Sequence, residues 1–350
     1  MEDFNLNTLV RPNVAGLKPY SSARDEFKTE GTEMIFLDAN ENPNDNGLNR
    51  YPDPQQTSVK EKLSEIKKVS PGNMLLGNGS DEVLDLIFRA FCEPGKDNVI
   101  TLPPTYGMYK VLADINNIEN REVLLNHDFE PDLTAIFEQV TEETKIIFLC
   151  SPNNPSGNSF EIDRIEKIFE NFNGLVVIDE AYIDFSDNES WIHRLEDFPN
   201  LIVTQTFSKA FGRAGIRLGV LYASDEIISI LNKIKPPYNV NQLTQNESLK
   251  VLFNSESIES QIIEIKRERA VLSKQLLEVN FISKIYKSDA NFLLIKVDDA
   301  TKRYNQFLEK GIVIRNRSNQ PLCDNCLRIT IGTQLENKKL IKAFKELENE

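Results

Sequence analysis

Short, almost wholly apolar runs alternate with segments of helical spacing between residues 37 and 239, and this alternation limits the possible folds most. The runs NVITLPP, KIIFLCSP and GLVVIDEAY end in polar residues or proline, and LIVTQTFS and RLGVLYAS have the same character. Strands that are apolar on both faces are typical of a sheet that helices cover on each side. The sequence therefore predicts an α/β fold with a mostly parallel sheet between helices.

Two of the segments between the runs carry helix signals. Residues 58–69 have helical spacing and are stopped by a Pro-Gly pair. Residues 80–92 form a second expected helix, with a Gly-Ser start and the acidic Asp81 and Glu82 in its first turn. Small polar caps and early acidic residues are typical of a helix N-terminus.

The length of 350 residues predicts about two domains, and residues 235–238 (Lys-Pro-Pro-Tyr) break the alternation at the expected junction. We expect an N-terminal arm over 1–36 that packs on the small domain, a large domain over 37–240, and a linking helix with a small domain over 241–350. The small domain is expected to be α+β, built from the C-terminal part and the arm. Its expected elements are a charged helical stretch over 242–279, strands over 291–297, 312–316 and 327–332, a helix over 304–310 and a final Lys/Glu-rich helix.

Acidic side chains outnumber basic ones by 54 to 40, which gives a net charge of −14. Such a field repels phosphate backbones, so we expect neither nucleic acid nor a membrane as a partner, and any anionic ligand needs local donors. The apolar runs are too short to span a bilayer, and the N-terminus has no signal-peptide pattern. We therefore expect a cytoplasmic protein.

Four cysteines are too few for a disulfide scaffold in a chain of this length. Cys323 and Cys326 form a C-x-x-C pair, but Cys92 and Cys150 are isolated and the chain has only two histidines. A zinc site needs more ligands than this. We expect no metal and two reduced thiols near a strand, and the role of the pair stays open.

Two turns that follow apolar runs are candidate binding loops. GNGSDE (77–82) opens a helix, where free N–H groups and the helix dipole favour an anion, although a plain helix cap fits equally well. It is neither a Walker loop nor a full dinucleotide fingerprint. SPNNPSG (151–157) forces a sharp loop that is expected to leave Asn153 and Asn154 pointing outward, or it is an ordinary turn.

Two further places carry ionisable groups at strand ends, where ligands collect in open α/β sheets. Asp179, Glu180 and Tyr182 follow the run GLVVI, and a carboxylate there can bind a metal, act as a base or pair with a cationic ring nitrogen. Lys209 lies in TFSKAFGRAGIRLG; desolvation favours a neutral, nucleophilic amine, whereas a solvated surface lysine is the plain alternative. Together these groups are what pyridoxal 5′-phosphate requires: donors for the phosphate, a carboxylate for the ring nitrogen and a lysine for the aldehyde.

The motifs KPYSSAR, LDANENP, NRYPDP, RAFCEPGKD, PPTYGMY, CSPNNPSG, DEAYIDF, TFSKAFG and CLRITIGT follow one another over nearly the whole chain. In this order and spacing, the sequence resembles the aminotransferases of the aspartate-aminotransferase fold and, among them, the histidinol-phosphate aminotransferase family. The resemblance implies pyridoxal 5′-phosphate as cofactor. It also implies a homodimer with a shared active site.

The resemblance assigns catalytic roles to residues around the cofactor ring. Lys209 is implied to hold the cofactor and then to move the proton at the substrate's α carbon. Asp179 is implied to pair with the ring nitrogen, and Tyr106 to stack on the ring. Asn154 and Tyr182 are implied to bond the ring's phenolic oxygen, and Asn154 also to contact substrate.

The resemblance also assigns binding roles at the two anionic ends of the site. The residues implied to hold the cofactor phosphate are Gly79, Ser80, Asp81, Thr206, Ser208 and Arg217. Tyr51 is implied to reach that phosphate from the partner subunit. Tyr20, Arg315 and Arg328 are implied to bind substrate anions, for which guanidinium groups are well suited.

The activity that the resemblance implies is a transamination in histidine biosynthesis. L-histidinol phosphate and 2-oxoglutarate are expected to give imidazole acetol phosphate and L-glutamate. An aromatic or branched-chain aminotransferase and a threonine-phosphate decarboxylase share the cofactor and remain alternatives. A cofactor-sensing regulator is disfavoured, because this acidic chain has no basic DNA-binding segment.

Overall fold

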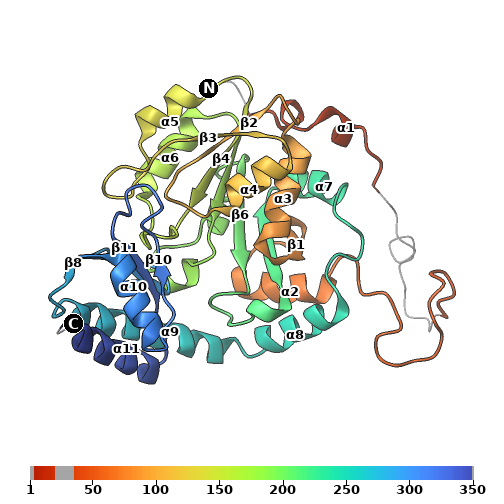
Figure 1. The fold of residues 1–350 in the computed structure, drawn as a ribbon. Coiled ribbons are helices and arrows are strands. Elements are labelled where there is room, and N and C mark those ends of the chain that lie inside the picture. The colour runs from red at the N-terminus through yellow and green to blue at the C-terminus, as the bar shows by residue number, and fades with distance from the viewer. Residues whose placement is uncertain (1–3, 20–34, 349–350) are drawn as a thin grey trace.

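The computed structural model describes residues 4–19 and 35–348, and its larger sheet has seven strands in the order β1-β7-β6-β5-β4-β2-β3 (Figure 1). Four neighbouring pairs are parallel, whereas β7 runs antiparallel to both β1 and β6. The mostly parallel sheet is therefore confirmed. In spatial order the strands are β1 (Met74–Asn78), β7 (Leu218–Ala223), β6 (Leu201–Thr206), β5 (Leu175–Asp179), β4 (Thr144–Cys150), β2 (Asn98–Thr101) and β3 (Glu119–Glu122).

Helices cover both faces of this sheet because successive strand residues point to opposite sides. In β4, Ile147 and Leu149 pack with α2, α5 and α6, whereas Ile146 and Phe148 pack with α3, α4 and α7. The expected helices over 58–69 and 80–92 are α2 and α3. The helices of this part of the chain are α2 (Thr57–Lys67), α3 (Gly79–Phe91), α4 (Met108–Ile115), α5 (Leu133–Gln139), α6 (Ile162–Asn171), α7 (Asp225–Asn232) and α8 (Gln242–Leu252).

The second sheet is antiparallel and has the order β10-β11-β9-β8. It forms a separate small α+β unit, which Figure 1 shows in blue beside the large domain. None of the helices in the described residues is both long and apolar enough to cross a membrane. The elements of this unit are β8 (Ile282–Ile285), β9 (Phe292–Val297), β10 (Arg315–Asn316), β11 (Cys326–Thr330), α9 (Ser255–Leu276), α10 (Ala300–Glu309) and α11 (Gln334–Leu347).

The charged stretch expected as one linking helix is two helices, because α8 ends at Leu252 and α9 begins at Ser255. The two helices pack in different places. Leu252 belongs to the core of the large domain, whereas Leu272 and Leu276 belong to the core of the small domain. The break between them lets each helix bury its apolar face against its own domain.

The described part of the N-terminal arm, residues 4–19, packs on the large domain. It contains η1 (Leu6–Thr8) and α1 (Pro12–Ala15), the latter labelled in Figure 1. Val14 packs in the core that contains α3. The backbone N–H of Arg11 donates to the carbonyl of Ala90 at 3.0 Å. The expectation that the arm packs on the small domain is therefore wrong for these residues, because their apolar side chains meet the apolar C-terminal end of α3.

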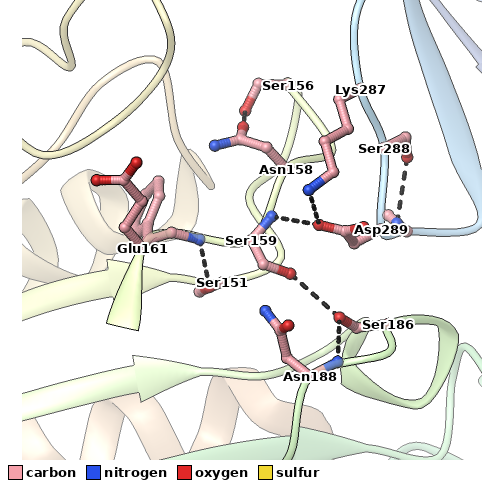
Figure 2. A network of polar contacts seen from close by, with 12 residues as sticks. Ser151, Ser156, Asn158, Ser159, Glu161, Ser186, Asn188, Lys287, Ser288 and Asp289 are labelled. Atoms are coloured by element: carbon pink, nitrogen blue, oxygen red, sulfur yellow. Dashed lines mark hydrogen bonds and ion pairs between the residues drawn. The ribbon is translucent and has the colours of Figure 1, made fainter. Parts of the chain in front are cut away.

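A polar network joins the SPNNPSG loop of the large domain to the small domain (Figure 2). The Ser159 N–H donates to Oδ2 of Asp289 at 3.0 Å, and the Asp289 N–H donates to the carbonyl of Gly157 at 2.7 Å. Gly157 has a φ of +90°, and a Cβ there would lie 2.7 Å from Oγ of Ser288, so this close approach requires glycine. The contact fixes the loop that carries Asn154 against the domain that carries Arg317 and Arg328.

Candidate active site

A cavity of about 320 Å³ opens where β4, β5 and β6 end, between the N-terminus of α3 and the small domain. It brings together most of the residues that the sequence singled out. Gly79, Tyr51 and Arg315 do not line it, and Tyr20 lies outside the described residues. Its lining residues are Ser80, Asp81, Tyr106, Cys150, Asn154, Asp179, Ala181, Tyr182, Thr206, Ser208, Lys209, Ala214, Arg217, Arg317 and Arg328.

Asp179 ends β5 and is only 2% exposed. Its Oδ2 accepts a hydrogen bond of 2.8 Å from the Tyr109 hydroxyl, and its Oδ1 accepts one of 3.2 Å from the Ala181 N–H. Burial raises the pKa of Asp179, and these hydrogen bonds offset part of the shift. Within the described residues the carboxylate has no ion pair, so it is suited to a cationic group on a bound molecule.

Sequence reasoning missed Tyr109, which is fully buried beneath the cavity. Its ring lies edge-on to Tyr106 at 5.6 Å and stacks on Phe148 at 5.0 Å. The available signal was the spacing in PPTYGMY, where residues three apart at the start of a helix lie on the same side. That spacing alone does not show that the second tyrosine reaches Asp179.

Lys209 follows β6 in the Ser-Lys loop, and its ammonium lies 5.6 Å from the centroid of the Tyr182 ring. The side chain is accessible through the cavity, but the surrounding walls still desolvate the amine. This desolvation lowers the pKa of Lys209, as does the charge of Arg328, whereas Asp179 opposes the shift. The lysine is thus a cavity amine with an increased neutral fraction.

The N-terminus of α3 and the loop before β7 form one end of the cavity, where the hydrogen-bond donors suit an anion. Gly79 has a φ of +77°, and a Cβ there would lie 2.5 Å from Nη2 of Arg217, so glycine is required. Arg217 Nη1 donates to Oγ of Ser208 at 3.5 Å, and the Ser208 N–H donates to Oγ1 of Thr206 at 3.1 Å. The Gly79 N–H donates to the carbonyl of Arg217 at 2.9 Å, but no side chain caps α3 at Asn78, so the N–H groups after Gly79 are left for an anion.

Two tyrosine hydroxyls face the same cavity. Tyr106 donates to Oδ1 of Asp81 at 2.9 Å, and burial followed by the charge of Asp81 raises the pKa of Tyr106. Tyr182 lies edge-on to Phe292 at 5.2 Å, and burial raises the pKa of Tyr182 as well. Both hydroxyls therefore remain protonated at neutral pH and can donate hydrogen bonds.

The two asparagines of SPNNPSG have different surroundings, and the expectation that both point outward is wrong for Asn153. Its amide is fully buried and donates to the carbonyl of Pro104 at 2.9 Å and to Oγ of Ser156 at 2.7 Å. Only Asn154 faces the cavity, where its Oδ1 accepts a hydrogen bond from Nη1 of Arg328. The loop folds back on itself, so one amide satisfies buried backbone groups.

The small domain contributes Arg328 from β11 and Arg317 from the loop after β10. Burial, followed by the charge of Arg317, lowers the pKa of Arg328 to about 10. Arg315 lies opposite Arg328 in the β-ladder but is exposed and does not line the cavity, so its assigned role stays a prediction. Sequence reasoning missed Arg317 because the chain leaves the strand at Asn316, and strand alternation no longer indicates where its side chain lies.

Tyr51 and the C-x-x-C pair lie outside the cavity of their own chain. Tyr51 stacks on Tyr238 at 4.5 Å with an interplanar angle of 18°. Cys323 and Cys326 are free thiols of the small domain, both fully buried in the apolar cluster that this domain shares with the large one. No group of three or more side chains suited to holding a metal occurs among residues 4–19 and 35–348.

The family model for aminotransferase class I and II matches residues 26–344, and the chain belongs to this class of enzymes. It is 87% identical to the histidinol-phosphate aminotransferase of Christiangramia forsetii over 350 residues, which is the whole of both chains. It is 63% identical to that of Flavobacterium johnsoniae over 99% of this chain and 100% of the relative. Within the class, the chain is a member of the histidinol-phosphate aminotransferase family.

The fold agrees with this assignment. The crystal structure of histidinol-phosphate aminotransferase from Sinorhizobium meliloti, in complex with pyridoxal-5′-phosphate, superposes with a TM-score of 0.78. The two sequences are 24% identical, and the superposition covers 86% of this chain and 83% of that one. The expected fold class of a large α/β domain with a smaller C-terminal domain is therefore confirmed.

Proposed function

We propose that this chain uses pyridoxal 5′-phosphate to transfer the amino group of L-histidinol phosphate to 2-oxoglutarate, giving imidazole acetol phosphate and L-glutamate in histidine biosynthesis. The observation that carries the proposal is a buried carboxylate, Asp179, and a cavity amine, Lys209, in one pocket with three arginines. The identity of 87% to a histidinol-phosphate aminotransferase over the full length supports the choice of substrate.

The residues present fit the cofactor at three points. The uncapped start of α3 with Ser208 and Arg217 suits its phosphate, Asp179 suits its ring nitrogen, and Lys209 suits its aldehyde. Gly79 at a positive φ keeps the phosphate end open to the backbone N–H groups. When bound, the cofactor supplies an electron sink for the charge that develops at the substrate's α carbon.

The protein's own groups then control protons and charge. Asp179, held by the Tyr109 hydroxyl, keeps the ring nitrogen protonated. Lys209 takes the proton from the substrate's α carbon and returns one, because its lowered pKa increases the fraction of neutral amine. Tyr106 and Tyr182 remain protonated and orient bound groups as hydrogen-bond donors.

Both substrates are anions, and the protein carries a net charge of −14. Arg328 and Arg317 supply the local positive charge that binding requires. We propose that the active protein is a cytoplasmic homodimer in which Tyr51 of each chain contacts the cofactor phosphate of the other. Arg315, and Tyr20, which lies outside the described residues, are proposed to contact substrate.

A donor panel tests the proposal. The purified protein, loaded with pyridoxal 5′-phosphate, is given 2-oxoglutarate with L-histidinol phosphate, L-phenylalanine or L-threonine phosphate, and glutamate and carbon dioxide are measured. We expect glutamate mainly from L-histidinol phosphate and no carbon dioxide. Carbon dioxide from threonine phosphate would instead indicate a decarboxylase, and a preference for phenylalanine would indicate an aromatic aminotransferase.

A further inference from the structure

We propose that Arg317 is a specificity-determining residue that binds the phosphate group of the amino donor together with Arg328. The inference rests on the proposed function and deepens it, since neither the motifs nor the expected roles include Arg317. It also predicts that Arg317 contributes little to the binding of 2-oxoglutarate and glutamate.

The first observation is an unsatisfied donor at the cavity wall. Arg317 is half-buried and lines the cavity that also contains Lys209 and Arg328. Its Nε is buried and has no hydrogen-bond partner among the described residues. No other hydrogen bond or ion pair within the described residues holds its guanidinium either, so the side chain is available to an anionic ligand in the cavity that it lines.

The second observation is that the loop after β10 holds the backbone of Arg317 in place at the cavity wall. The Arg317 N–H donates to the carbonyl of Cys326 at 2.8 Å, and its own carbonyl accepts from the N–H of Gln320 at 2.9 Å. The turn closes with a hydrogen bond of 2.9 Å from the Cys326 N–H to the carbonyl of Cys323. Both thiols are fully buried, so the C-x-x-C pair anchors the loop that presents Arg317.

The third observation is that Arg328 already donates a hydrogen bond within the protein, so fewer of its N–H groups are free for a ligand. Its Nη1 donates to Oδ1 of Asn154, and its guanidinium lies 5.2 Å from the Phe292 ring. The remaining donors match a carboxylate, which has one charge and two oxygens. A phosphate monoester carries close to two charges and three acceptor oxygens, and a second guanidinium at the same wall supplies the additional donors.

Charge supports the same assignment. Burial and then the charge of Arg315 lower the pKa of Arg317, while burial and then Arg317 lower the pKa of Arg328. The guanidinium groups therefore repel one another in the unliganded cavity. A dianion relieves this repulsion more than a monoanionic carboxylate does, which favours the phosphorylated donor.

The test measures kcat and KM of the cofactor-loaded enzyme for L-histidinol phosphate and for 2-oxoglutarate in wild type, Arg317→Gln and Arg317→Lys. In Arg317→Gln we expect KM for L-histidinol phosphate to rise about 10- to 100-fold, as for loss of a charged hydrogen bond, with KM for 2-oxoglutarate nearly unchanged. Arg317→Lys should show a smaller rise for L-histidinol phosphate, because lysine retains the charge without the fork. Arg267→Gln, which removes an exposed arginine of the same domain, is the matched control and should change neither KM.

The visible absorbance of the bound cofactor should be the same in all variants. Equal KM changes for both substrates, or no change for either, would overturn the inference. If Arg317→Gln does not fold, Arg317→Lys provides the test. A rise in KM for L-histidinol phosphate relative to KM for 2-oxoglutarate would support the inference, and an unchanged ratio of the two would overturn it. A wild type without turnover of L-histidinol phosphate would overturn the proposed function and this inference together, whereas wild-type turnover with an unchanged ratio would overturn the inference alone.

Discussion

Replacing Tyr109 by phenylalanine removes one hydroxyl from the cavity floor and should slow the reaction through Asp179. The lost bond is 2.8 Å long, fully buried and made to a carboxylate. Hydrogen bonds to charged groups contribute about 1.5–3 kcal/mol, which corresponds to about 1–2 pKa units. The bond favours the ionised form, so its loss should raise the pKa of Asp179 further above its usual range.

Asp179 is then protonated up to a higher pH than in the wild type, and the protonated carboxyl no longer keeps the ring nitrogen cationic. We therefore expect Tyr109→Phe to lower kcat about 10- to 100-fold and to move the acidic limb of the pH–kcat profile upward by about 1–2 units. The phenyl ring should keep the stacking on Phe148, so folding should be little affected.

The assay is a pH–kcat profile of the cofactor-loaded enzyme from pH 5 to 9, with thermal melts alongside. Tyr222→Phe is the matched control, because Tyr222 is a buried tyrosine that has no hydrogen bond to Asp179. An unchanged kcat and an unshifted acidic limb in Tyr109→Phe would refute the reasoning. An equal effect of Tyr222→Phe would do so as well.

Three further changes have defined outcomes. Asp179→Ala should lower kcat by about 10²–10³-fold while much of the cofactor stays bound after dialysis, because it removes one preorganised charge; near-normal turnover would contradict this. Burial raises the pKa of Glu180 to about 7, so the folded state holds a proton that the unfolded state releases between about pH 4.5 and 7. Wild-type stability relative to Glu180→Gln should therefore fall as pH rises through this window, by on the order of 3 kcal/mol in melts at each pH, and a constant difference would argue against it. Asp289→Ala removes the acceptor for the Ser159 N–H between the domains and should cost about 1–2 kcal/mol in urea unfolding, whereas unchanged stability would show that the network is dispensable.

The architecture and the meeting of Asp179 and Lys209 in one cavity could be predicted from the sequence because they depend on local patterns. Fully apolar runs such as the one ending at Cys150 become buried parallel strands. Asp179 ends one such strand and Lys209 follows another, and strand ends of a parallel sheet meet at one edge. The positions of these two residues after their strands were therefore sufficient to predict that their side chains lie at the same edge of the sheet.

The missed features depend on packing between segments far apart in the chain. Tyr109 acts on a carboxylate 70 residues away, and nothing local indicates that its hydroxyl reaches it. Arg317 faces the cavity because its loop closes on Cys326, which strand alternation does not predict. Asn153 turns inward to a carbonyl 49 residues earlier in the chain. Val14 of the arm packs against the core that contains α3, and nothing in the arm's own sequence indicates which domain covers it.

The measurement that tests the account most directly locates the lysine that carries the cofactor. The loaded protein is reduced with borohydride, digested and mapped by mass spectrometry. The strongest alternative as the lysine that carries the cofactor is Lys60. It is buried, and its pKa is lowered to about 8 by burial and then by the charge of Lys235. The account predicts the cofactor on the peptide that contains Lys209 and none on Lys209→Ala; label on Lys60 or any other lysine of the wild type would contradict it.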